Sequence, residues 1–214
     1  MKTDLQLKKE VTDELDWDPS IDASAIGVEV HDGVVTLNGH LRSYAGKLAA
    51  ERAAEKVSGV RAVVVNLDVR PASVLSDEAI GTAARDALQW HVHLPQDVIK
   101  VRVEKGWVTL AGEVDWGYQR RIAERTVSHL RGVTGVTNLI RLMARNAPPD
   151  VVERIQAALR RHAEREAKHI NVSMKDGTVT LTGHVDSISE RQAALGAAWS
   201  APGVSAVVDH LHLA

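Results

Sequence analysis

The 214-residue sequence contains no cysteine and no phenylalanine, and only 3% of its residues are aromatic. The absence of cysteine excludes disulfides, thiolate metal sites and cysteine nucleophiles. Because large rings are scarce, the core must be built from Val, Leu, Ile and Ala, which suits several small domains better than one large one. The hydrophobic share of 44% is ample for packed cores of this kind.

A strong charge of one sign and long apolar runs are also absent. The formal net charge is -2, so no global basic field attracts nucleic acid, and nucleic acid is not an expected partner. Eighteen consecutive apolar residues occur nowhere, so no transmembrane segment is expected. The N-terminal stretch MKTDLQLKKEVTDELDWD carries acids and lysines where a signal peptide needs an apolar run. We therefore expect a cytoplasmic protein.

The sequence also lacks the common catalytic motifs. It has no G-x-S-x-G elbow, no H-E-x-x-H pair and no phosphate-binding loop. Asp and Glu are plentiful, but their spacing places them on helix faces and turns, whereas acid-base catalysis needs carboxylates that converge in a pocket. We expect no enzymatic activity, no catalytic residues and no cofactor.

The chain does contain one line written three times, as GVVTLNGHL (33–41), GWVTLAGEV (106–114) and GTVTLTGHV (177–185). A Gly-Val pair follows each copy, beginning at Gly59, Gly132 and Gly203. The interval between the first glycine of the line and this second glycine is 26 residues in every copy. Such regularity indicates three repeats of one folding unit.

Each unit begins with an amphipathic helix and a short strand. The apolar positions of the three helices are Leu7, Val11 and Leu15; Ile80, Ala84 and Leu88; and Val152, Ile155 and Leu159. An alternating strand follows, with its apolar residues at Ile26, Val28 and Val30; Ile99, Val101 and Val103; and Ile170, Val172 and Met174.

A tight turn (HDG, EKG or KDG) leads into the Val-Thr-Leu strand, where Val35, Leu37 and Leu41 face inward and Thr36 and His40 outward. Gly39, Gly112 and Gly183 occupy inward positions, which predicts a bulge or a close approach of the next helix. A second helix follows, the Gly-Val pair ends it as a C-cap, and VVVNLDV, VTNLIRL or VVDHLHL forms a last strand.

These patterns predict an α+β protein of three tandem α-β-β-α-β units, each with two helices packed on one face of a three-stranded mixed sheet. The predicted domains are residues 1–72, 73–146 and 147–214, with short joints at 70–76 and 144–150.

The glycine-x-Val-Thr-Leu-x-Gly strand, the helix after it and the closing Gly-Val resemble the BON domain. The resemblance covers nearly the whole chain and implies an α-β-β-α-β module without catalytic residues. It also implies an association with phospholipid membranes, with osmotic and envelope stress, and with accessory roles on pores and channels. Many members are exported, which makes the periplasm the second choice of location, and one relative with a single unit senses potassium.

Ten histidines raise the question of a metal site. His91/His93 and His210/His212 have the i,i+2 spacing that places both rings on one face of a strand, and in the last strand Leu211 and Leu213 then face the core. No third ligand lies at helical spacing from either pair, and the pattern is absent from the other repeats. The sequence therefore favours exposed strand histidines, and no metal site is predicted; zinc or nickel is the alternative.

The few aromatic residues are unevenly distributed. Trp17 and Trp90 are equivalent, 73 residues apart, whereas Trp107, Trp116 and Tyr118 of the second repeat have no aromatic counterpart in the other repeats except Tyr44 nearby. Trp107 is predicted at an outward strand position, and Trp116 and Tyr118 at the start of a helix that continues with Arg120 and Arg121. Tryptophan beside arginine suits the headgroup layer of a membrane, while the alternative is that these rings pack one repeat against the next.

Charge points to the same repeat, because residues 74–146 carry ten basic and eight acidic residues while both flanking repeats are net acidic. We therefore expect a stress-associated adaptor that contacts anionic phospholipid or an envelope protein through Trp90, Trp107, Trp116, Tyr118, Arg120 and Arg121. The alternative is a soluble ion or small-ligand sensor that works by rearranging its domains. A basic run in the third repeat (Arg154, Arg160, Arg161, Arg165 and Lys168) is interspersed with glutamates and is expected to be a solvated helix face.

Overall fold

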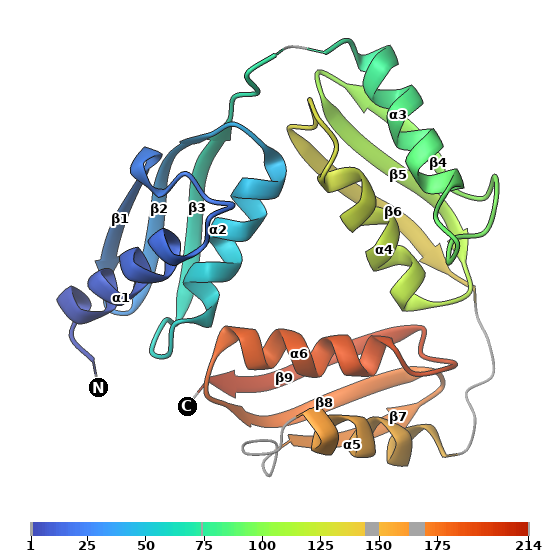
Figure 1. Ribbon diagram of the computed structural model, residues 1–214. Coiled ribbons are helices and arrows are strands. Elements are labelled where there is room, and N and C mark those ends of the chain that lie inside the picture. The colour runs from blue at the N-terminus through green and yellow to red at the C-terminus, as the bar shows by residue number, and fades with distance from the viewer. Residues whose placement is uncertain (1, 74, 144–149, 163–169, 214) are drawn as a thin grey trace.

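The computed structural model describes residues 2–73, 75–143, 150–162 and 170–213, and it contains the predicted unit three times (Figure 1). The first unit comprises α1 (Asp4–Trp17), a 3₁₀ turn (Ala23–Ala25), β1 (Ile26–His31), β2 (Val34–Leu41), α2 (Tyr44–Lys56) and β3 (Ala62–Val69). The second comprises α3 (Asp77–Gln89), β4 (Lys100–Glu104), β5 (Trp107–Val114), α4 (Gly117–Ser128) and β6 (Gly135–Leu142). The third comprises α5 (Val151–His162), β7 (Ile170–Lys175), β8 (Thr178–Val185), α6 (Ile188–Trp199) and β9 (Ala206–Leu213). Within the described ranges, no helix combines the length and the apolarity needed to cross a bilayer.

The Val-Thr-Leu strand is the centre of a three-stranded mixed sheet in every unit. In the first unit, β2 pairs antiparallel with β1 and parallel with β3. The turn between β1 and β2 holds Asp32 and Gly33 at φ of 49° and 77°, the backbone of a type I′ hairpin. The predicted α+β architecture is confirmed.

Each unit has an aliphatic core of its own between its helices and its sheet. The helix residues expected to face inward, Leu7, Val11 and Leu15, are almost fully buried, as are Val35 and Leu37 of β2. The residues that strand alternation and four-residue helical spacing predict to face inward are therefore the ones found in the core.

The third unit departs from the prediction at its first helix. Val151, rather than Val152, shares the buried face with Ile155, and Val152 is half-buried. Two adjacent valines make the register of a short helix ambiguous, whereas the four-residue step from 151 to 155 fits one face. The side chain of Leu159 lies outside the described residues. So does the predicted basic run, apart from Arg154, whose Nε donates to the Asp150 carboxylate at 2.7 Å.

Gly39 lies at an inward position of β2, but the element that crowds it is not the one predicted. A β-carbon on Gly39 would lie 2.1 Å from the carbonyl oxygen of Ala25, in the 3₁₀ turn before β1. Gly112 meets the carbonyl of Val98 in the same way, at 2.3 Å. The prediction that the next helix approaches here is wrong, because Ile26 pairs with Gly39 and the chain that enters β1 passes directly over it.

The second helices end earlier than predicted. α2 ends at Lys56 and is capped by Val57, so Gly59 lies beyond the cap, in the turn that leads to β3. Gly59 and the equivalent Gly132 and Gly203 all have positive φ. Glycine is thus required by the left-handed backbone of this turn, and not by the helix cap itself.

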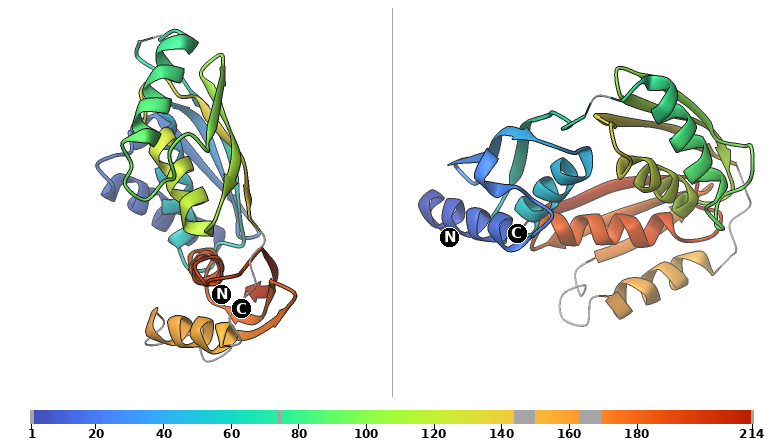
Figure 2. Two further views of the ribbon diagram at one scale, coloured as in Figure 1. Left: turned by 90° about the vertical axis from the view of Figure 1, so that its right-hand side faces the viewer. Right: turned by 45° about the horizontal axis from the view of Figure 1, so that its top comes forward.

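The units contact one another through the first residue of each second helix. Tyr44 of α2 packs against the core of the second unit, and its hydroxyl is hydrogen-bonded to the backbone of Val136. Gly117 of α4 lies against Trp199 of α6, where an added β-carbon would be 2.5 Å from the Trp199 carbonyl oxygen. Ile188 of α6 packs against the core of the first unit. These contacts run from the first unit to the second, to the third and back to the first, so the three units close a ring with α2, α4 and α6 on its inner side (Figures 1 and 2).

Tyr44→Ala is expected to loosen the ring. The pKa of the Tyr44 hydroxyl is raised chiefly by burial, so the neutral phenol is the form that docks. We expect a loss of about 1 kcal/mol in the free energy of unfolding, and a larger radius of gyration by small-angle X-ray scattering. Because the folded-state pKa of Tyr44 is raised, the contact is fully present at any pH below the ordinary tyrosine pKa and is lost as the pH rises through the raised pKa. Wild type should therefore loosen only above about pH 10. Tyr44→Phe should keep the ring closed at neutral pH and remove this pH dependence; an unchanged Tyr44→Ala variant would contradict the assignment.

Candidate functional site

The most exposed aromatic side chain of the second unit is in the 90–93 loop, which follows α3. Trp90 caps α3, with its backbone N–H directed to the carbonyls of Asp86 and Leu88, and 88% of its surface is exposed. Val92 is 87% exposed. Leu88 and Leu94, on either side, are buried in the core. Two buried leucines therefore anchor a short loop that presents an indole and an isopropyl group to solvent.

Gln119 fixes this loop to the start of α4. Its side-chain Nε2 donates to the carbonyl of His93 at 3.1 Å, and its Oε1 accepts from the backbone N–H of Trp116 at 3.1 Å. The His93 and Tyr118 rings meet edge to face, with centroids 6.4 Å apart. The structure thereby places the 90–93 loop against the start of α4, where Trp116 and Tyr118 are half-buried.

Gln119 was not among the predicted site residues. It is one of the few buried polar side chains among the described residues, and it occupies the N3 position at which a capping-box glutamine is expected. Tryptophan at the N-cap obscures that pattern, because the usual Ser, Thr, Asp or Asn is missing.

The two arginines that follow have different neighbours. The Arg121 guanidinium donates to the Ser200 hydroxyl of the third unit at 2.8 Å, next to the C-terminus of α6, where a positive charge is favourable. Partial desolvation lowers the pKa of Arg121, although guanidinium stays charged at neutral pH. Arg120 is half-buried, and its backbone carbonyl accepts from the Asn138 side chain of β6 at 3.0 Å. Arg121 therefore serves the joint between units.

Trp107 is separated from the other predicted residues by the length of β5. It starts the strand, whereas Trp116 follows its end, so about 25 Å of extended chain lies between them. Trp107 has the predicted outward position and is 49% exposed. Its ring covers Gly135, where a β-carbon would lie 2.4 Å from the ring, and its Nε1 donates to the Thr137 hydroxyl at 2.8 Å. Trp107 packs within its own sheet, apart from the 90–93 loop and the start of α4.

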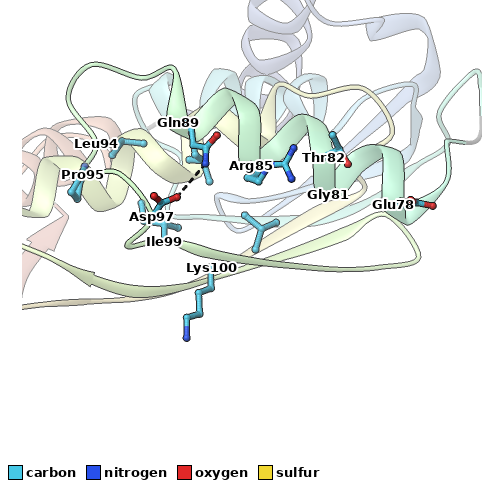
Figure 3. Close-up of a pocket in the computed structure, with 12 residues that line it drawn as sticks. Glu78, Gly81, Thr82, Arg85, Gln89, Leu94, Pro95, Asp97, Ile99 and Lys100 are labelled. Atoms are coloured by element: carbon cyan, nitrogen blue, oxygen red, sulfur yellow. Dashed lines mark hydrogen bonds between the residues drawn. The ribbon is translucent and has the colours of Figure 1, made fainter.

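A cleft of about 510 Å³ runs beside the 90–93 loop, between α3 and β4 (Figure 3). Leu88, Leu94 and Ile99 form its apolar floor, while Gln89 donates to the Asp97 carboxylate across it at 3.2 Å. Gly81 leaves it open, since only Val103 would touch an added β-carbon; the equivalent position of the first unit carries Lys8. The cleft gives the loop an apolar recess on its flank.

Two clusters of titratable groups have structural explanations. His91 and His93 lie in the loop, so the strand geometry that would place both rings on one face does not apply to them. The His91 Nδ1 accepts from the His93 backbone N–H at 3.4 Å. Asp4, His31 and Asp32 place potential ligand atoms within 4.8 Å of one another. Both carboxylate oxygens of Asp4, however, accept backbone N–H groups of the β1–β2 turn, and Asp77 repeats this clamp in the second unit.

Known proteins resemble the chain at the level of this repeated unit. A curated relative, the osmotically-inducible protein Y of Escherichia coli (strain K12), is 30% identical over 148 residues, which make up 64% of this chain and 72% of the relative. Two structures of CdsD, a structural protein of the type III secretion system of Chlamydia trachomatis, are each 17% identical. They cover 100% and 98% of this chain and 100% and 92% of their own, with TM-scores of 0.27 and 0.26, too low for a conclusion about shared architecture.

The family comparison is more direct. The BON domain matches residues 3–71, 76–144 and 149–214. These ranges leave only a few residues between and outside the three matches. The chain belongs to the BON-domain family and consists of three such domains in tandem.

Proposed function

We propose that this protein is a non-enzymatic, stress-associated adaptor that contacts anionic phospholipid through its middle BON domain. The osmotic induction named for the Escherichia coli relative supports the association with stress. The exposed 90–93 loop, with Trp90 and Val92 almost free of neighbouring atoms, is the single observation that supports the contact surface.

The chemistry of this loop suits a lipid headgroup layer. Indole is favoured where one side of the ring meets water and the other meets apolar groups. Trp116 and Tyr118 are half-buried at the start of α4, next to the loop, and Arg120 adds a positive charge to the same helix. Since each basic residue near an anionic surface contributes about 1 kcal/mol at most, binding should be weak and sensitive to salt.

Trp90→Ala is expected to weaken binding to anionic vesicles by about tenfold or more, because burial of a large apolar side chain contributes at least about 1.5 kcal/mol. The measurement is co-sedimentation with phosphatidylglycerol vesicles at low and high salt, together with the blue shift of tryptophan fluorescence. Trp17→Ala is the matched control, since Trp17 is the equivalent residue of the first unit and is 84% exposed. Its neighbour two residues on is Pro19 instead of a valine.

Equal binding by wild type and Trp90→Ala, or equal losses from Trp90→Ala and Trp17→Ala, would contradict a site in the middle domain. Binding to neutral vesicles that salt does not weaken would contradict the role of anionic headgroups. No binding to any vesicle would sink the lipid proposal and leave an envelope protein as the partner to seek.

The second candidate is a soluble ion or small-ligand sensor of the potassium-sensing kind, and the closed ring favours it. A cleft of about 760 Å³ lies between the first and third units, lined by Lys2 and Arg61 on one side and by Asp186 and Ser187 on the other. Clefts between domains are common ligand sites, and a ligand bound there would change how the ring closes. Scattering profiles in matched potassium and sodium buffers test this role. Identical profiles would contradict potassium sensing.

A further inference from the structure

Three of the ten histidines lie on one open sheet face of the third unit. The register places His184 of β8 directly opposite His212 of β9, and Thr182 opposite His210. All three histidines are exposed, whereas Leu211 between the last two is buried. The sequence identified His210 and His212 as an outward pair; His184 is the third member, which only strand pairing reveals.

His184 and His212 already stand at a separation suited to a shared ion. Their ring centroids are 5.9 Å apart. Two imidazoles that bind one tetrahedral Zn²⁺ at 2.0–2.1 Å place their ring centres about 5 Å apart, so a small rotation of either exposed ring is enough. His210 follows the same face of β9, two residues before His212, and its exposed side chain is free to turn towards them.

The face that carries these rings is not used by the ring of domains. The third unit meets its neighbours through α6, by way of Ile188, Trp199 and Ser200. The helices cover the other face of the sheet, where Asp209 accepts from the Arg191 guanidinium at 2.6 Å. The equivalent cross-strand pairs of the other units are His40 with Asp68 and Glu113 with Arg141, so a facing pair of imidazoles with a third on the same sheet face distinguishes the third unit.

We propose that His184, His210 and His212 bind one Zn²⁺ ion on the open face of the third domain. Neutral imidazole is a preferred ligand for zinc, and three of them leave a fourth tetrahedral position for water or for a group from a partner. The site lies on rigid paired strands, which fix two ligands on one strand and one on its neighbour. It is a binding site for a divalent transition-metal ion that does not depend on the lipid surface of the middle domain.

Isothermal titration of the full chain with ZnCl₂ tests the site. We expect one ion per chain, and a loss of affinity of at least about tenfold in both His184→Ala and His212→Ala. Because metal ions compete with protons for their ligands, Zn²⁺ binding should weaken in acid. The three side chains are exposed, so the variants should unfold at the temperature of wild type, which a thermal melt in the presence of a chelator checks.

The His91→Ala/His93→Ala double variant is the matched control, since those rings are 5.7 Å apart but have a backbone hydrogen bond on one ring nitrogen and lie in a loop. It should bind Zn²⁺ as wild type does. Absence of binding to wild type, half an ion per chain, or a loss confined to the control variant would each overturn the proposal.

Discussion

Leu110→Ala is expected to destabilise the middle domain by about 2–5 kcal/mol, the range for a large-to-small change in a packed core. Leu110 has no exposed surface and lies on the central strand, with Val101 beside it on β4 and Asn138 beside it on β6. Helix residues Ala123 and Val127 close the same core from above. A cavity left here is enclosed by two fixed strands and a helix, so the surroundings relax only in part.

The measurement is native-state hydrogen exchange during a urea titration, which reports the middle domain separately from its neighbours. Leu139→Ala is the matched control, because Leu139 is on the neighbouring strand but 57% exposed on the outer face. Its cost should stay within about 0.5 kcal/mol. A loss well below 1 kcal/mol for Leu110→Ala would mean that the inward and outward faces of β5 are assigned the wrong way round.

Most of the fold could be predicted from local patterns in the sequence. A period of two along Val-Thr-Leu defines which side of the central strand is buried, and Val108 and Leu110 are fully buried as predicted. A step of four residues does the same for Leu7 and Val11 on the first helix. These predictions succeed because strand alternation and helical spacing are properties of a single segment, independent of what the segment packs against.

The contacts between domains could not be predicted in that way. Tyr44, Gly117 and Ile188 occupy the same position of the repeat and all face a neighbouring unit, yet they share neither size nor chemistry. Each of the three residues packs against a different surface, so no pattern that repeats along the sequence indicates them. In the sequence, Tyr44 stands out only as the aromatic of the first repeat that lies near the position of Tyr118, which does not indicate a contact with another unit.

The candidate site shows the same division. The uneven distribution of tryptophan points to the middle domain, where the 90–93 loop lies against the start of α4. Trp107 is predicted to lie with the aromatic residues of these two segments because that grouping rests on the uneven distribution of aromatic residues and leaves out the rise of the strand between Trp107 and Trp116. Its packing partner Gly135 replaces the alanine of the other repeats, and the missing side chain makes room for the Trp107 ring. This compensation can be recognised only once the pairing of β5 with β6 is known.

Gly39→Val is expected to unfold the first domain. The φ of Gly39 is 141°, a conformation that valine rarely adopts, and a β-carbon would lie 2.1 Å from the Ala25 carbonyl oxygen. That atom belongs to the backbone, so relief requires the 3₁₀ turn and the start of β1 to move together. Backbone strain of this kind costs about 1–3 kcal/mol before the steric overlap is added, and a small domain has little stability to lose.

Gly27→Val is the matched control for Gly39→Val, since Gly27 is one strand away, has no positive φ, and would bring its β-carbon no closer than 3.7 Å to the Asn38 carbonyl. Valine favours a strand, so this variant should fold as wild type does by circular dichroism and melt at the same temperature. Loss of the first domain in Gly39→Val should also remove the contacts of Tyr44 and Ile188, because both lie at its boundary. The ring would then open at two joints and keep only the contact of α4 with α6, which scattering would register as an extended chain. A folded and compact Gly39→Val variant would reject both the crowding at Ala25 and the dependence of ring closure on the first domain.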